Sequence, residues 1–290
     1  MTRPDVIVGS AGQRFVLVHY HIFKNGGSTI EAILEREFPG RFAALHGPHA
    51  SSTLDRRELE RFLRRNPKLT AISSHHLRYP KPAIRNTVIF DCCFLRHPLE
   101  RLDSLYRYLR GVPGDDYLAS RARGMTPREF FRELIDEAPH LISNVQVTQI
   151  ACAGAFARPA HHGDLERAAA ILGDMAVPGV VERFEQSLAA AEYFLQPAFP
   201  DISLEFVPQN VSGGHATCSE ERLTRFWGAE IYDDLYRLNR LDLELFALAD
   251  EEIRRRFALI PQAERRLLDL RSRCARLRGE LPPAFAVGAP

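Results

Sequence analysis

Lysine and net charge are both scarce in this 290-residue chain. Arginine supplies all but three of the 38 basic residues, and 37 acidic residues leave a formal net charge of +1. A chain with so little net charge has no bulk field that would attract nucleic acid or an anionic membrane. We therefore expect no nucleic-acid partner, and any anion-binding site must be local.

Cysteine pairs and long apolar runs are missing too. The five cysteines are scattered, odd in number and without a C-x-x-C pair. This pattern argues against a disulfide framework or a structural zinc site and fits a reducing cytoplasm. No stretch approaches the ~20 consecutive apolar residues of a membrane span, and residues 1–13 lack the apolar segment of a signal peptide. We expect a cytoplasmic protein without a membrane span.

Short apolar runs alternate along the chain with segments of helical periodicity. The run 88–95 is almost continuously apolar, which is typical of a strand covered on both faces. The alternation predicts an α/β fold with a mostly parallel central sheet flanked by helices. We expect one domain over residues 1–260, followed by a helix and a loose tail over 261–290. Strands are predicted at 15–18, 69–73, 88–95, 178–182 and 204–207.

Capping residues and apolar spacing predict the helices between these strands. Ser52 or Thr53 can cap a helix that ends near Arg65, and Thr126 with Glu129 forms a capping box before a helix that ends near Glu137. Trp227 and Tyr232 are expected in the core. Further helices are predicted from 30 to the middle thirties and at 98–109, 143–152, 164–175, 186–194, 219–227, 231–257 and 262–281.

A glycine turn joins the first predicted strand to the first helix. Such a turn points backbone N–H groups and a helix N-terminus at one spot, which suits an anion. One of the three lysines, Lys24, stands beside the glycines and adds a compact point charge. An ordinary connection is the alternative, because glycine turns are common. The turn comprises Lys24, Asn25, Gly26, Gly27, Ser28 and Thr29.

A second turn with a cation follows the strand 88–95. Arg96 opens it, and Ser104 lies eight residues further on in the helix that follows. In a parallel sheet both turns lie at the carboxyl edge, where ligands bind. A ligand with two separated anionic groups could therefore be held by both turns. Arg96 taken alone is equally compatible with a surface or capping arginine.

The stretches His21–Ser28 (HIFKNGGS) and Phe94–Tyr106 (FLRHPLERLDSLY) together resemble the two nucleotide-binding motifs of PAPS-dependent sulfotransferases. PAPS is 3′-phosphoadenosine 5′-phosphosulfate. The resemblance is nearest to the carbohydrate branch that includes the heparan sulfate 2-O-sulfotransferases. With the later stretches 144–154, 181–188 and 239–246 it spans roughly residues 15–250. It implies a three-layer, P-loop-like α/β fold, PAPS as sulfate donor and PAP as product.

Carried over residue by residue, the resemblance assigns roles to both turns. The 5′-phosphosulfate would be held by the glycine-turn residues, and the 3′-phosphate by Arg96 and Ser104. Lys24 would stabilise the bridging oxygen as it becomes anionic. The chain departs from the family pattern at Phe23, where proline is usual, at Asn25, where threonine is usual, and at His97, where aspartate is frequent. Asn25 can still donate a hydrogen bond.

Transfer to a hydroxyl needs a general base, and histidine is the side chain best tuned for it. His75 and His76 follow the second predicted strand, so they belong at the same sheet edge as both anion turns. The carbohydrate branch aligns best with His75, and the cytosolic branch favours His76. His19 and His21 flank the glycine turn and are alternatives. We expect no metal, because a His-His pair finds no third ligand at useful spacing.

Two other protein classes compete with the sulfotransferase. A P-loop kinase or NTPase needs a lysine after its glycines, whereas Lys24 precedes them; Asp91 resembles a metal-binding aspartate, but its strand continues through Cys92 and Cys93. A non-catalytic nucleotide-binding module is the third reading. It could dimerise through 262–281, where an apolar stripe either packs on the body or pairs with another chain.

The acceptor is expected to be a carbohydrate or another small hydroxyl compound. Near-zero net charge argues against a long polyanion, and the absence of an anchor favours a bacterial cytoplasmic enzyme. Asn210–Ser219 is a polar loop that either closes over the nucleotide or only connects two elements. His161 and His162 are expected in solvent.

Overall fold

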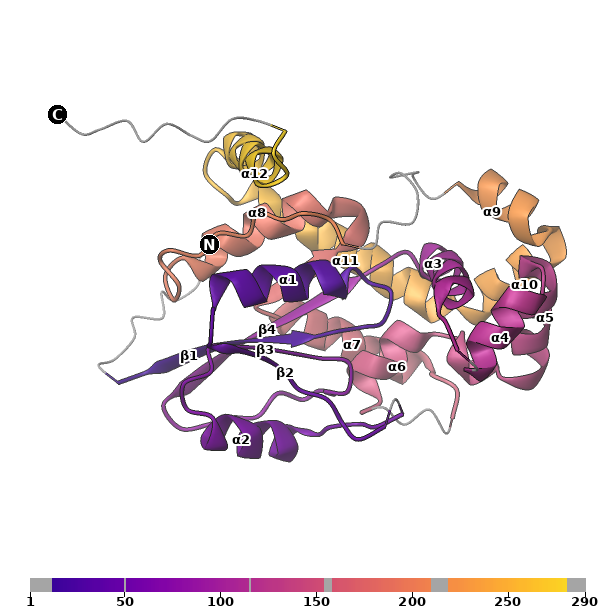
Figure 1. Cartoon of the computed structure of the whole chain (residues 1–290), viewed down its shortest axis with the longest axis horizontal. Helices are drawn as coiled ribbons and strands as arrows, with labels where there is room; N and C mark the ends of the chain where they lie inside the picture. The colour runs from indigo at the N-terminus through magenta and orange to yellow at the C-terminus, as the bar shows by residue number, and fades with distance from the viewer. Residues whose placement is uncertain (1–11, 50, 115, 154–157, 210–218, 281–290) are drawn as a thin grey trace.

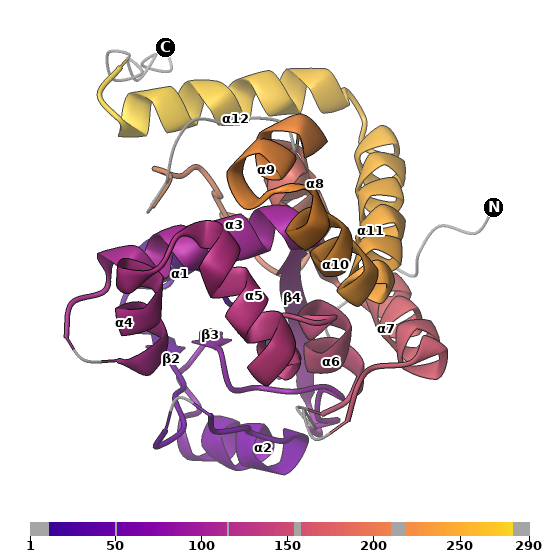
Figure 2. The ribbon, with the colours of Figure 1, turned by 90° about the vertical axis from the view of Figure 1, so that its right-hand side faces the viewer.

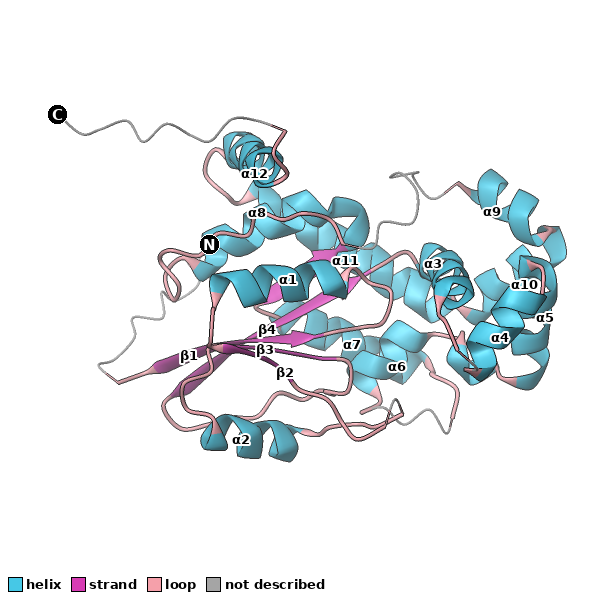
Figure 3. Ribbon diagram, in the orientation of Figure 1, coloured by secondary structure: helices cyan, strands magenta, loops and turns pink. Residues whose placement is uncertain are grey.

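A computed structural model describes residues 12–49, 51–114, 116–153, 158–209 and 219–280. Five parallel strands form one sheet in the order β2-β3-β1-β4-β5, with helices on both faces (Figures 1 and 3). The predicted α/β fold with a parallel central sheet is thereby confirmed. The strands are β1 (Arg14–Tyr20), β2 (Phe42–Ala44), β3 (Ala71–Ser74), β4 (Thr87–Leu95) and β5 (Val177–Val180).

Helices fill the connections and the C-terminal half. Their bounds are α1 (Gly27–Glu37), α2 (Arg56–Arg65), α3 (Pro98–Gly111), α4 (Tyr117–Gly124), α5 (Pro127–Glu137), α6 (Val145–Ala151), α7 (His162–Asp174), α8 (Phe184–Leu195), α9 (Glu220–Trp227), α10 (Ala229–Leu238), α11 (Arg240–Ala258) and α12 (Ala263–Leu277), with short 3₁₀ turns at Pro139–Leu141 and Val181–Arg183.

Alternating side chains of the central strands build two separate cores. Val16 and Val18 of β1 pack with α2, α6, α7 and the first part of α11, whereas Leu17 packs on the opposite face with α1, α8 and α12. This period of two is the signature of a strand buried on both sides. Figure 1 shows α1, α8 and α12 above the sheet and α2, α6 and α7 below it.

A third core lies beyond the carboxyl edge of the sheet. It joins α3, α4, α5, α9 and α10 around Trp227, whose side chain is fully buried, with Tyr232 packed against it. Figure 2 shows α3, α4 and α5 gathered in front of the sheet, with α10 beside them. The expected core positions of both aromatic residues are confirmed. This lobe places α3 directly over the edge where the two anion turns lie.

The strand register brings three turns together. Tyr20, near the end of β1, pairs with Ser74 at the end of β3, and Leu95 at the end of β4 pairs with Val180. Because β3, β1 and β4 are adjacent and parallel, the turns after all three open at one edge. The glycine turn, the histidine pair and Arg96 therefore meet at this edge, as the sequence predicted.

Four local predictions are corrected. Asp55, with Glu58, caps α2 in place of Ser52 or Thr53. The helix predicted over 231–257 breaks at Asn239, because its buried side chain accepts from the Asn144 N–H and donates to the Leu235 carbonyl. Residues 204–207 form no strand: the N–H groups of Leu204 and Phe206 contact side chains of Glu192 and Cys274. The strand β2 was not predicted.

The C-terminal stripe packs on the body of the protein. Leu267, Leu270 and Cys274 of α12 are buried in the core shared with α1 and α8. This part of the stripe is therefore not free to pair with a second chain, and the proposed dimer contact loses its apolar face. Leu281 lies outside the described residues. Among the helices described, none has the length and apolarity required to cross a membrane.

Candidate functional site

The glycine turn forms the start of α1 as expected. Gly26 adopts a left-handed conformation with φ of 76° and is the N-cap of α1. Its carbonyl accepts the N–H groups of Thr29 and Ile30, which closes the first turn. The first turn of α1 contains no acidic side chain, so nothing on this helix competes with an anion for its positive end.

The two glycines are required for different reasons. At Gly26 the positive φ disfavours any residue with a side chain. Gly27 has an ordinary helical backbone, but a Cβ there would lie 1.8 Å from Nε2 of His21. Gly27 therefore exists to let the His21 ring pack flat against the start of α1. This contact ties the anion turn to the histidines behind it.

Lys24 stands half-buried at the mouth of the turn. Its Nζ lies 4.3 Å from the centre of the Tyr108 ring and 5.7 Å from that of Phe23. Burial, followed by repulsion from Arg96, lowers the pKa of Lys24 to about 8. Nη1 of Arg96 donates to the Lys24 carbonyl at 3.1 Å. Two cations from neighbouring turns are thus brought together, and a bound anion would stabilise both.

Gln146 of α6 clamps the two turns. Its Oε1 accepts from the Asn25 side chain at 2.8 Å and from the Arg96 N–H at 3.0 Å, and its Nε2 donates to the Arg96 carbonyl. Asn25 donates its second amide hydrogen to the Phe94 carbonyl. Both amide hydrogens of Asn25 are therefore used inside the protein, and its backbone N–H donates to the Ile22 carbonyl at 3.2 Å. The expectation that Asn25 could still donate to a ligand is not met, and Asn25 shapes the turn instead. Asp242 accepts the backbone N–H of Gln146 and so holds the clamp.

The hydroxyl residues differ in their availability. Ser28 is exposed on α1. Thr29 is buried, and its Oγ1 accepts from the Gln209 N–H at 3.0 Å. Ser104 is buried on α3 close to Glu100 and Asp103, both of which are paired with the Arg222 guanidinium. Burial lowers the pKa of Arg96, while the neighbouring carboxylates of Glu182, Glu100 and Asp103 act to raise it.

His76 is committed to the fold. It is buried, and its Nδ1 accepts the Gly47 N–H at 2.7 Å. A neutral imidazole whose Nδ1 accepts carries its proton on Nε2. Neither ring nitrogen of His76 is then free to take a proton from a substrate. The structure therefore places only one residue of the predicted pair in a state suited to general base catalysis.

His75 has the opposite tautomer. Its Nδ1 lies 3.2 Å from the His21 carbonyl, which can only accept, so Nδ1 carries the proton and Nε2 has the lone pair. The ring packs on His21 with centroids 3.6 Å apart, and Phe23 meets it edge-on at 5.8 Å. Burial, followed by repulsion from His21, lowers the pKa of His75 to about 4, while Glu31 acts to raise it. His75 is neutral at pH 7 and half-buried beside the turn.

A buried hydrogen-bonded chain supports these rings. Oε1 of Glu31 accepts from His21 Nδ1 at 3.0 Å and from the Ser73 hydroxyl at 2.8 Å. Because Ser73 gives its hydrogen to Glu31, it accepts from Nδ1 of His19 at 2.9 Å. Burial alone would raise the pKa of Glu31, but these hydrogen bonds lower it. These hydrogen bonds fix the carboxylate of Glu31, ten residues beyond His21, which no sequence pattern singles out.

The donor atoms of His19, His21 and Glu31 all lie within 4.8 Å of one another, which is close enough to hold a metal ion. The hydrogen bonds among Glu31, His21 and Ser73 use the same atoms. The expectation that the reaction needs no metal stays a prediction. His161 and His162 are exposed at the start of α7, as expected. Residues 210–218 lie outside the described chain, and Ser219 caps α9.

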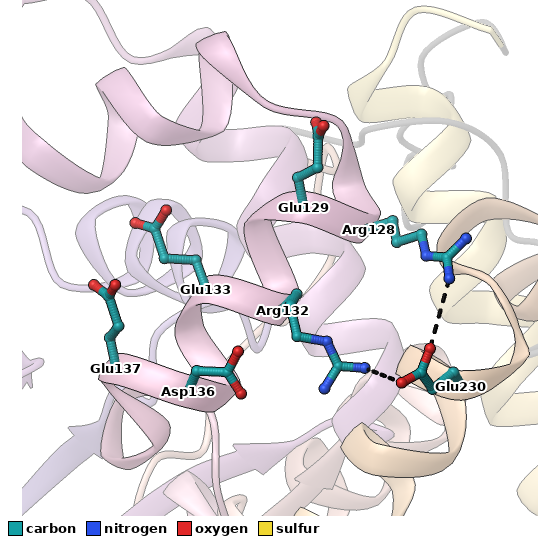
Figure 4. Close-up of a pocket in the computed structure, with 7 residues that line it drawn as sticks. All are labelled: Arg128, Glu129, Arg132, Glu133, Asp136, Glu137 and Glu230. Carbon is teal, nitrogen blue, oxygen red and sulfur yellow. Dashed lines mark hydrogen bonds and ion pairs between the residues drawn. The ribbon is translucent and has the colours of Figure 1, made fainter.

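A hollow between α5 and α10 lies apart from this edge. Arg132 and Arg128 both pair with Glu230 across it, and each of these side chains is substantially exposed (Figure 4). Exposed ion pairs of this kind are ordinary solvated surface. The hollow holds none of the residues that converge at the carboxyl edge, so the site is assigned to that edge.

Comparison with known proteins agrees with this assignment. A model of the family described as "Sulfotransferase family" matches residues 12–249, which include the whole sheet and both anion turns. A protein of Archaeoglobus fulgidus, described as uncharacterized, is 27% identical over 249 residues, covering 80% of this chain and 95% of that protein. With its parallel sheet, its glycine turn and a family match over most of its length, the chain belongs to the sulfotransferase family.

Proposed function

We propose that this protein transfers the sulfuryl group of PAPS to a hydroxyl of a carbohydrate or another small acceptor. One observation carries the proposal: Lys24 and Arg96 are held together at the edge where His75 presents an unprotonated Nε2. A pair of cations suits a donor with anionic groups at both ends, and the imidazole suits a hydroxyl that must lose a proton.

The residues at the two turns fit PAPS. The N-terminus of α1, with the backbone of Gly26 and Gly27, would hold the 5′-phosphosulfate together with Ser28 and Thr29, while Asn25 would keep the turn in shape through its hydrogen bonds to Gln146 and the Phe94 carbonyl. Arg96 and Ser104 would hold the 3′-phosphate. Nε of Arg96 is buried without a hydrogen-bond partner among the described residues, and a buried donor of this kind is costly until an acceptor reaches it. PAP would bind to the same groups.

The proposed transfer is a single in-line step. The acceptor hydroxyl gives its proton to Nε2 of His75, its oxygen forms a bond to sulfur, and the bond from sulfur to the nucleotide phosphate oxygen breaks. Lys24 stabilises the charge that develops on that leaving oxygen. A bound anion raises the pKa of both Lys24 and His75 above their values in the free protein, which keeps the lysine charged and strengthens the base.

The kinase alternative would need Asp91 to hold a magnesium ion, and the surroundings of Asp91 give that role little support. Asp91 lies inside β4, is buried, and pairs with Lys81 at 2.6 Å. Its Oδ1 also accepts the Ala176 N–H. A carboxylate engaged in this way is poorly placed to hold a magnesium ion at the strand end. The non-catalytic module differs from the proposed enzyme only in turnover, so that alternative needs a direct assay.

Thermal shift with PAP, ATP–Mg and GTP–Mg tests the ligand class. We expect PAP to stabilise the protein, and stabilisation by ATP–Mg alone would contradict the proposal.

Turnover of PAPS by the variants His75→Ala and His76→Ala tests which histidine is the base. His75→Ala should bind PAP normally but lose turnover by at least about 10²-fold, the lower end of the usual contribution of a general base. His76→Ala should keep the chemistry and lose stability. If both variants turn over normally, the base lies elsewhere.

A further inference from the structure

Two large aromatic side chains lie exposed beside the proposed catalytic groups. Phe23 in the glycine turn is 37% exposed and Tyr108 on α3 is 42% exposed. Their ring centroids lie 5.3 Å apart at an interplanar angle of 82°. Single exposed aromatics are common, but these two come from separate elements and touch each other. They form a continuous aromatic surface, here called the aromatic wall.

The aromatic wall spans the distance between the proposed base and the proposed electrostatic catalyst. Phe23 contacts the His75 ring at 5.8 Å, and Tyr108 faces Nζ of Lys24 at 4.3 Å. A hydroxyl that reaches Nε2 of His75 while facing the sulfur near Lys24 must therefore bring its carbon frame against Phe23 or Tyr108. The faces and edges of these two rings are then the main surface that contacts the acceptor.

Apart from Lys24, which is assigned to the donor, the charged side chains that flank Tyr108 on α3 already have partners. Arg107 pairs with Asp103 at 3.2 Å, and the guanidinium of Arg110 lies over Tyr106. Phe23 also stands where the resembled family usually has proline, so the ring is a feature of this chain. Together these observations favour a neutral, flat acceptor.

We propose that Phe23 and Tyr108 select an acceptor whose reactive hydroxyl is carried by an aromatic ring, that is, a phenol. The proposal rests on the proposed function, since it names the acceptor class of the same site. Edge-to-face and offset-stacked contacts between rings favour such a ligand beyond the area that it buries. In the transfer, the phenolic proton goes to His75, the aryl oxygen bonds to sulfur, and PAP leaves.

The test compares matched acceptors. PAPS turnover is measured with 2-naphthol, with decahydro-2-naphthol, which has the same frame without aromaticity, and with methyl glucoside. We expect kcat/KM for 2-naphthol to exceed that of both others by at least tenfold. Phe23→Ala should lower kcat/KM for 2-naphthol about tenfold, chiefly through KM, as expected for the loss of one aromatic contact. Phe23→Tyr should restore it.

Controls separate this proposal from the proposed function. Tyr236→Ala removes a comparably exposed aromatic from α10, away from the site, and should change nothing. Binding of 2-naphthol to the PAP-saturated protein is followed by its fluorescence. If no acceptor is turned over, the result counts against the proposed function, while weaker binding of 2-naphthol to Phe23→Ala would still support the role of the aromatic wall. A preference for methyl glucoside, or 2-naphthol binding that Phe23→Ala leaves unchanged, would overturn the proposal of a phenolic acceptor.

Discussion

Replacing Gly27 by alanine should break the link between the glycine turn and the histidines. The new Cβ would lie 1.8 Å from Nε2 of His21, whereas ordinary contacts begin at 3.4 Å. The ring must therefore move by roughly 1.6 Å. That displacement exceeds what the 3.0 Å hydrogen bond from His21 to Glu31 can absorb, so the bond is lost.

The expected magnitude follows from two opposing effects. A hydrogen bond to a charged group contributes about 1.5–3 kcal/mol, and replacing glycine by alanine in a helix returns about 1 kcal/mol. We expect the free energy of unfolding, measured in urea titrations, to fall by about 0.5–2 kcal/mol. Turnover should fall by about 10²-fold, because the His75 ring packs on His21 and moves with it.

Two further variants make this prediction specific. Gly173→Ala lies in α7 with nothing within 4 Å of the added Cβ, so it should stabilise the protein slightly. In a His21→Ala background the clash is absent, and Gly27→Ala should then cost nothing in stability. The reasoning would be refuted if Gly27→Ala still lowered the free energy of unfolding in the His21→Ala protein. It would also be refuted if Gly27→Ala alone left stability and turnover normal.

Two other predictions concern charge. Glu31→Gln keeps both hydrogen-bond partners but removes the carboxylate that raises the pKa of His75. The acid limb of the plot of kcat/KM against pH should therefore move to lower pH. If the limb does not move, Glu31 has a purely structural role. Lys24 has a folded-state pKa of about 8, below its value of 10.5 in the unfolded chain. The unfolded state thus binds more protons than the folded state between these two pH values, so the free energy of unfolding rises with pH in that range. At pH 7 the charged lysine therefore destabilises the fold. Lys24→Met should raise Tm at pH 7 while losing PAPS turnover; a lowered Tm would contradict this.

The sheet and the meeting of both turns were predictable because they depend on local patterns. Continuous apolar runs identify β1 and β4, and parallel topology then brings their carboxyl ends together. β2 was missed because it is only three residues long and none of them is buried. Residues 204–207 were mistaken for a strand because their alternation reflects burial, whereas their N–H groups bond to side chains.

Long-range hydrogen bonds inside the site were beyond sequence reasoning. Gln146 lies 121 residues from Asn25, and only the fold reveals that one side chain holds both turns. The stretch 144–154 did resemble the family, but nothing in it pointed to a role. The preference for His75 over His76 in the proposed mechanism also needed the structure, because it rests on the partner of each Nδ1, the His21 carbonyl for His75 and the Gly47 N–H for His76.

The geometry of the site gives a physical reason why position 24 carries one of the few lysines of this arginine-rich chain. Arginine is always charged and presents a planar fork, and Arg96 uses its fork to hold the backbone of Lys24. A second arginine at position 24 would spread its charge over that fork, whereas the proposed transfer needs a point charge on one leaving oxygen. The arrangement has a cost, because burial and then repulsion from Arg96 lower the pKa of Lys24. Gln146 and Asn25 hold the turns together against this repulsion, so an anion that neutralises the pair binds to a site already formed.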